Sequence, residues 1–174
     1  KGDDMRILVS SAMVTLVLLL AVPAMSQDFD KGHRAYKTKN YAAALDEWWP
    51  LAAQGNARAQ AWVGFMYDKG YGVQQDDIEA LTWYLKAVRE KQAHRGNAYA
   101  AFHLGEKYRE GRGVRRDNVI AYMWYRVAGT ADADRFVKRV EEKIQMMKMS
   151  SAEIDSGERH TRQCVSKKYR NCGR

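Results

Sequence analysis

The sequence is poor in the residues and motifs that define metalloproteins and small disulfide-rich modules. It contains two cysteines and two prolines in 174 residues. Two cysteines exclude a disulfide framework and a four-thiolate zinc site. The low proline content and 46% hydrophobic residues exclude a proline-rich or disordered chain. The length excludes a large multidomain enzyme and allows one compact domain or a short repeat array.

Motifs that carry catalysis are also missing. There is no glycine-rich phosphate loop, no G-x-S-x-G, no H-E-x-x-H and no Ser-x-x-Lys. Met146, Met147 and Met149 could ligate copper, but Met147 continues the apolar spacing of a helix, which favours packing. We therefore expect a non-enzymatic protein with no metal and no cofactor. The histidines lack metal-ligand spacing and are His33, His94, His103 and His160.

The N-terminal segment has the pattern of an export signal. A basic residue precedes an apolar run over residues 7–22, and small residues then allow cleavage after Ala24 or after Ser26. The run is shorter than the roughly 20 apolar residues of a membrane-spanning helix. The pattern predicts a cleaved signal peptide over residues 1–26, with residues 1–4 upstream of its start, rather than a retained anchor. No cysteine follows either cleavage site, so we expect a periplasmic or secreted protein without a lipid anchor.

The formal net charge of +8 comes from the second half of the chain. Residues 27–88 hold 7 basic and 8 acidic side chains, whereas residues 89–174 hold 20 basic and 11 acidic ones. Export argues against nucleic acid as a partner, so we interpret the basic half as attracted to an anionic envelope surface. A solvated basic face that aids solubility is an equal alternative. The residues concerned include Arg112, Arg115, Arg116, Arg135, Lys138, Arg139, Arg162, Lys167, Lys168 and Arg170.

Two segments of the chain repeat one another. Residues 56–88 and 97–129 align at an offset of 41, and such self-similarity indicates a repeat architecture. Each copy predicts two helices joined by a glycine-containing turn. We expect a neighbouring helix to approach closely at the glycine inside each first helix, because glycine there costs about 1 kcal/mol relative to alanine. The identities include Asn56/Asn97, Gly64/Gly105, Tyr67/Tyr108, Gly70/Gly111, Trp83/Trp124 and Tyr84/Tyr125.

Cap residues predict where these helices begin. Asn56 and Asn97 are N-cap types that precede the two first helices. Asp76, with Glu79 three residues later, predicts a capping box at the start of a second helix.

The residues shared by both copies resemble a known repeat. The pattern A-x(4)-G-x-x-Y-x-x-G-x-G-V-x-x-D-x(3)-A-x-x-W-Y-x-x-A is similar to the Sel1-like repeat (SLR), a relative of the tetratricopeptide repeat. The resemblance implies an all-α fold, a right-handed α-solenoid in which each hairpin buries a face by stacking on its neighbours. It further implies full repeats at residues 57–93 and 97–130 and a degenerate first repeat at residues 28–56.

Residues 131–174 predict a helical cap on the array. Ser150 with Glu153 forms a second candidate capping box. In an oxidising compartment, Cys164 and Cys172 most simply form a disulfide, since a redox pair of free thiols would be expected to have C-x-x-C spacing. An apolar helix face precedes the box, at the spacing of Phe136, Val140, Ile144 and Met147.

Positions that differ between the two copies predict a binding face. On the first helices, four changing positions step by 4, 3 and 4 residues and so share one stripe. In tetratricopeptide-like arrays the first helices line the concave surface. We therefore expect a peptide-binding groove formed by Arg58, Trp62, Phe65, Lys69, Tyr99, His103, Glu106 and Arg109.

Other interpretations of this stripe stay open. Drift on a solvated face explains Lys69 well but Trp62 and Phe65 poorly, because two aromatic rings there would expose an apolar patch. Packing on the first repeat explains both rings as well as a groove does. The sequence thus predicts an exported scaffold that binds a protein or peptide. The alternative, suggested by cysteine-rich SLR relatives, is a binder or hydrolase of β-lactam or cell-wall-like compounds.

Overall fold

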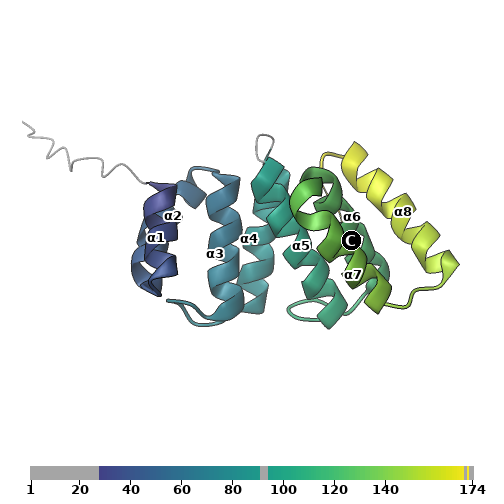
Figure 1. Ribbon diagram of the computed structural model, residues 1–174, viewed down its shortest axis with the longest axis horizontal. Coiled ribbons are helices and arrows are strands. Elements are labelled where there is room, and N and C mark those ends of the chain that lie inside the picture. Colours follow the sequence, from purple (N-terminus) through teal and green to yellow (C-terminus); the bar gives the residue numbers. More distant parts are fainter. Residues whose placement is uncertain (1–27, 91–93, 171, 173–174) are drawn as a thin grey trace, which may run out of the picture.

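The described helices form three hairpins and a two-helix cap. The computed structural model describes residues 28–90, 94–170 and 172. The hairpins stack in chain order along the long axis of the molecule, which makes the fold an all-α helical repeat solenoid (Figure 1). They are α1 (Phe29–Lys37) with α2 (Tyr41–Ala53), α3 (Ala57–Lys69) with α4 (Asp77–Arg89), and α5 (His94–Glu110) with α6 (Asn118–Ala131), followed by α7 (Ala133–Met146) and α8 (Ser151–Ser166).

The predicted signal peptide, residues 1–26, lies outside the described residues. Among the helices that are described, none combines the length and the apolar character needed to cross a bilayer. The hairpin of α1 and α2 falls within residues 28–56, where a degenerate first repeat was expected.

Local sequence signals set most helix ends. Asn56 accepts a hydrogen bond from the backbone N–H of the third residue of α3 at 3.0 Å. Asp76 caps α4 by accepting from two backbone N–H groups of its first turn. Ser150 and Glu153 form the predicted capping box of α8. Gly70 ends α3 with φ of 68°, a left-handed conformation that glycine adopts without a Cβ clash.

One predicted helix start is wrong. Asn97 was expected to be an N-cap, but α5 begins at His94, so Asn97 lies inside the helix. An N-cap residue requires a non-helical backbone, and residues 94–96, directly before Asn97, are helical. In the alignment of the two copies, α5 therefore extends further toward its N-terminus than α3 does.

A glycine of the first helix meets a buried aromatic ring of the second helix in each hairpin. The pairs are Gly32 with Trp48, Gly64 with Tyr84 and Gly105 with Tyr125, and a Cβ on the glycine would lie 2.5, 3.0 and 2.6 Å from the ring, respectively. All three rings are fully buried. The close approach predicted at the two repeated glycines is confirmed, and the first hairpin has the same contact.

The cap closes the C-terminal end of the array on α6. Phe136 and Val140 of α7 are buried in the core that α5 and α6 share. On α8, Gly157 meets the ring of Tyr122 from α6, where a Cβ would lie 2.5 Å away. Residues 164 and 172 form the predicted disulfide, with Cα atoms 5.2 Å apart, and both cysteines are buried. The disulfide ties the tail to α8.

The glycine contact can be tested by adding one methyl group. Gly105→Ala is expected to lower the free energy of unfolding by roughly 1–3 kcal/mol, because the new Cβ would lie 2.6 Å from Tyr125. Gly129→Ala is the matched control, since its Cβ would meet its nearest neighbour, Val140, at 3.9 Å. Alanine there should be neutral or stabilising by up to about 1 kcal/mol. Urea denaturation measures both, and equal effects would contradict the close contact.

Candidate peptide-binding groove

Aromatic side chains from three successive first helices form one half-buried row. Tyr36 of α1 contacts Trp62 of α3, with ring centroids 4.9 Å apart. Trp62 stacks on Tyr99 of α5 at 5.7 Å, with 14° between the planes. Tyr99 lies 4.5 Å from His103. Phe65 approaches both α5 rings, at 6.0 Å and 5.6 Å. We call these five residues the aromatic row.

The rings of the row are partly packed and partly accessible. Trp62 lies 4.8 Å from the buried ring of Trp48 in the first hairpin, and Phe65 contacts Tyr36 at 6.1 Å. Packing on the first hairpin thus accounts for part of each ring. All five side chains of the row are nevertheless only half-buried, and their accessible surface is what a groove would use.

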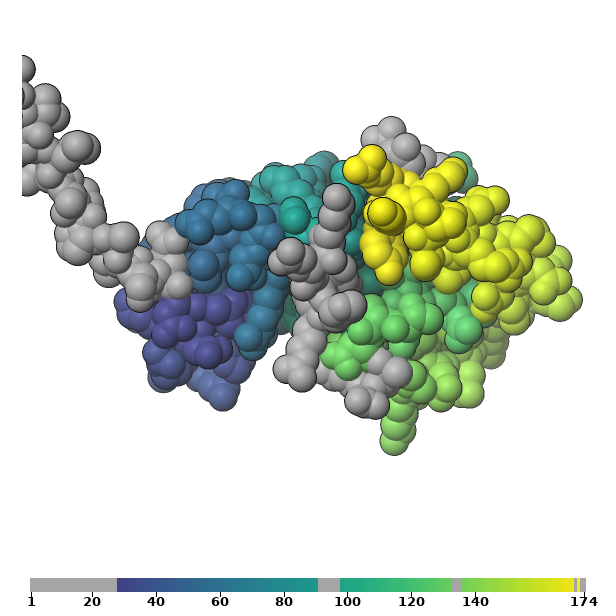
Figure 2. Space-filling model, turned by 90° about the horizontal axis from the view of Figure 1, so that it is seen from above, coloured from purple at the N-terminus to yellow at the C-terminus, as the bar shows by residue number. Residues whose placement is uncertain are grey.

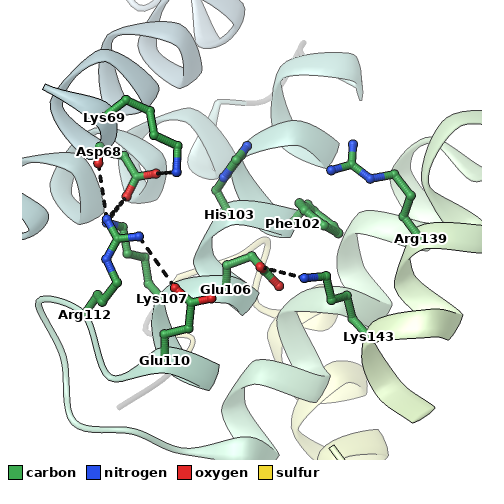
Figure 3. A pocket seen from close by; sticks show the side chains of 10 residues that line it. All are labelled: Asp68, Lys69, Phe102, His103, Glu106, Lys107, Glu110, Arg112, Arg139 and Lys143. Atoms are coloured by element: carbon green, nitrogen blue, oxygen red, sulfur yellow. Dashed lines mark hydrogen bonds and ion pairs between the residues drawn. The ribbon is translucent and has the colours of Figure 1, made fainter. Parts of the chain in front are cut away.

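A pocket of about 230 Å³ lies at one end of the row, between α3, α5 and α7. His103 belongs to both the row and the pocket and so joins them (Figure 3). In the space-filling view, the purple and blue N-terminal helices and the green α7 lie on opposite sides of an indented lower edge (Figure 2). The side chains that surround the pocket include Asp68 and Lys69 of α3, Phe102 and Glu106 of α5, and Arg139 and Lys143 of α7.

A buried ion network joins α3, α4 and α5 beside this pocket. Lys107 is 2% exposed and donates to Asp68, which is 3% exposed, and to Asp77. Arg112 donates to the same two carboxylates at 2.6 and 2.8 Å. Burial alone would raise the pKa of Asp68, but hydrogen bonds from Lys107 and Lys69 outweigh it, so the pKa lies below its usual value. The network keeps Asp68 ionised although its side chain is buried.

Glu106 is a second carboxylate whose negative charge is balanced by neighbouring side chains of the protein. It accepts from the hydroxyl of Tyr125, from Lys143 at 2.9 Å and from Arg109 at 3.2 Å. Burial would raise its pKa, but these three hydrogen bonds outweigh burial and lower it. Arg109 also pairs with Glu110. Glu106 therefore connects α5 with α6 and α7, and Arg109 supports it.

His103 is neutral at physiological pH. Its ring stacks on the buried ring of Tyr84, with centroids 5.3 Å apart and 7° between the planes. Burial lowers the pKa of His103 to about 4, against the opposing charges of Asp68 and Glu106. The described residues contain no group of three histidine, cysteine, aspartate or glutamate side chains placed to hold a metal ion.

The structure gathers most of the residues predicted from the stripe. Four of them are in the aromatic row, and Lys69 and Glu106 line the pocket. Arg58 stands apart: its guanidinium lies 3.8 Å from the ring centroid of Phe29 and 3.9 Å from Asp30.

Sequence reasoning missed several residues of this site, because they lie outside the stripe of changing positions on the first helices. Tyr36 belongs to the first hairpin, Phe102 is an α5 residue outside the stripe, and α7 carries Arg139 and Lys143. A hydrophobic pattern assigns α7 to the cap. It does not indicate that the polar side of α7 faces the pocket.

These features define a solenoid of helical hairpins with a half-buried aromatic row on its first helices and a charged pocket at the end of that row. The sequence profile of the Sel1 repeat matches residues 57–91 and 98–132. The chain therefore contains two Sel1 repeats, and it has the SLR fold. Sel1-repeat scaffolds typically mediate protein–protein interactions and are typically non-catalytic.

Two solved structures are similar to the chain. A Sel1 repeat protein from Oxalobacter formigenes is 36% identical over 67% of this chain and 44% of that one, with a TM-score of 0.56. A protective antigen of uropathogenic Escherichia coli strains, which displays an SLR fold, is 26% identical over 79% of this chain and 30% of that one, with a TM-score of 0.66. The chain spans less than half the length of either protein. No curated protein matches the chain.

The ion network predicts that two substitutions within it have non-additive effects on the free energy of unfolding. Lys107→Met is expected to cost roughly 2–4 kcal/mol of unfolding free energy, because it leaves the buried Asp68 with fewer cations. Adding Asp68→Asn should recover part of that loss, because the buried charge is then removed too. Lys138→Met changes an exposed lysine and should stay within about 0.5 kcal/mol of the parent chain. Additive losses in the double variant, measured by urea denaturation, would contradict the coupling.

The pKa of His103 predicts acid sensitivity. Its pKa of about 4 in the fold lies below the ordinary 6.5, so the unfolded chain binds this proton first as the pH falls. Stability should therefore drop between pH 6.5 and 4, and His103→Gln should remove part of that slope, on the order of 1–3 kcal/mol at pH 4.5. His160→Gln, which leaves His103 in place, should keep the slope. Thermal unfolding at stepped pH measures it, and an unchanged slope in His103→Gln would refute the assignment.

Proposed function

We propose that this chain is an exported, non-enzymatic interaction scaffold that binds an extended segment of another protein along its first helices. The observation that supports this most directly is the aromatic row, which runs without a break across α1, α3 and α5 and ends at the pocket. Solenoids present extended concave surfaces of this kind to their ligands. A cluster of half-accessible aromatic rings is more typical of an interaction site than of an ordinary solvated surface.

The two ends of the groove would contribute differently. The row offers flat, rigid rings, which give contact area at a small entropic cost and dominate binding energy at interfaces. The pocket offers charged groups, which fix the orientation and register of a bound segment. A segment that lies across three hairpins would also hold them together, so binding should raise thermal stability.

Export is supported by two features of different kinds. Residues 1–26 have the signal-peptide pattern, and the disulfide between Cys164 and Cys172 requires an oxidising compartment to persist. We propose a periplasmic or secreted location on this basis. Exposed cations of α8 and the tail, away from the groove, would serve attraction to an anionic envelope surface, and they are Arg162, Lys167, Lys168 and Arg170.

Site-specific crosslinking tests the groove. A benzophenone amino acid at position 99, in extracts of the organism that encodes the chain, should capture a discrete and saturable partner, because Tyr99 lies at the centre of the row. The same probe at position 78 is the control, since Ile78 is 67% exposed on α4, outside the row. Trp62→Ala in the same chain should abolish capture at position 99.

Capture that is identical at both positions, or that survives Trp62→Ala, would contradict a groove on the first helices. Thermal unfolding of each variant accompanies the experiment, because Trp62 also packs on Trp48. A variant that has lost its helical circular dichroism is replaced by the milder Tyr99→Ser with the probe at position 65.

A further inference from the structure

The charges around the pocket do not balance. The carboxylates of the pocket and the adjoining ion network number four: Asp68, Asp77, Glu106 and Glu110. The cations number six: Lys69, Lys107, Arg109, Arg112, Arg139 and Lys143. With His103 neutral, the cluster carries an excess of two positive charges. In a partly enclosed, low-dielectric site, such an excess favours an anionic group from a ligand.

The acidic members of the cluster already have their partners. Asp68 contacts three cations of the cluster, and Glu110 is paired with Arg109 and Arg112. Glu106 is held by Arg109 and Lys143. These carboxylates are therefore neutralised by side chains of the protein itself, and they do not oppose an incoming anion as free charges would.

Two of the cations are the least committed. Arg139 has no ion pair among the described residues, and its guanidinium lies 4.5 Å from the ring centroid of Phe102. Lys69 is 39% exposed and shares its one carboxylate, Asp68, with two other cations. Both line the pocket, one from α3 and one from α7, with α5 between them (Figure 3). An anion in the pocket would be flanked by both.

We propose that the segment bound in the groove places an aspartate or glutamate side chain in the pocket, between Lys69 and Arg139, and an aromatic or large apolar side chain on the aromatic row. This inference rests on the proposed function, because it assigns the chemistry of the same groove. The ligand class is thus an acidic–apolar segment of a partner protein. A guanidinium and an ammonium together match a carboxylate through charge-assisted hydrogen bonds.

The spacing of the two subsites fits neighbouring side chains of one segment. The ammonium nitrogen of Lys69 lies 5.8 Å from the ring centroid of Phe65, a member of the row. In an extended chain, side chains on the same face are two residues apart and separated by about 7 Å. The acidic residue is therefore expected two positions from the apolar one.

Peptide selection on the full chain tests this assignment. Random decapeptides, displayed with flanking sequence at both ends, are selected on the parent chain and on Lys69→Gln/Arg139→Gln. The control is Arg162→Gln/Lys167→Gln, which removes the same charge from exposed positions of the cap. The parent and the control should enrich an aspartate or glutamate two positions from an aromatic or large apolar residue. The pocket variant should keep the apolar preference and lose the acidic one.

Affinity and salt dependence then give the magnitude. For the enriched peptide, changing its acidic residue to the amide should weaken binding about 10- to 100-fold on the parent chain and far less on Lys69→Gln/Arg139→Gln. Added salt should weaken the acidic peptide more than the amide peptide. Circular dichroism confirms that each variant is folded.

The outcomes separate the two proposals. Selected peptides that are apolar but not acidic, or an acidic preference that survives in the pocket variant, would overturn this inference and leave the groove intact. Enrichment that is the same on the parent chain and on Trp62→Ala would overturn the groove, and with it this inference.

Discussion

The close contact between a glycine and a buried ring is the constraint on which the rest of this solenoid depends. It sets how near the two helices of a hairpin lie, because any side chain on the glycine would collide with the ring. The same rings then support the next hairpin. Trp48 lies against Trp62, and Tyr84 stacks under His103. The interior packing of one hairpin thus positions the groove residue of its successor, and the site inherits the rigidity of the core.

The charged residues, unlike the aromatic rings, do not follow the repeat. Within the part of the chain that the structure describes, the ion network around Asp68 and Lys107 occurs once, between the second and third hairpins, and fixes the wall of the pocket. Ring contacts recur because every hairpin needs them, whereas the network makes one junction unlike the others. A site with a defined polar end becomes possible on an array of similar units, and the proposed acidic subsite lies there.

Most of the fold could be predicted from the sequence. The glycines, cap residues and aromatic residues that indicate helix ends and helix contacts occur in both copies, so each feature is indicated twice. The start of α5 could not be predicted, since Asn97 has the right residue type for an N-cap but the helix already begins at His94. The aromatic part of the site followed from positions that differ between copies. Of the charged part, only Lys69 and Glu106 followed in this way. Lys107 aligns with Met66 in the other copy, and Arg139 lies outside the repeats, so only three-dimensional proximity brings them to the pocket.

The support of each groove position by the preceding hairpin bears on how such an array can evolve. A gene duplication that copies one hairpin also copies the ring that its neighbour rests on, but not the ring beneath its own groove residue. The segment that must be copied together to keep a groove position and its supporting ring therefore starts at the second helix of one repeat and ends with the first helix of the next. Recombination that transfers this whole segment would carry a groove position and its supporting ring together into another array. Exchange of whole hairpins would instead separate each ring from the residue it supports.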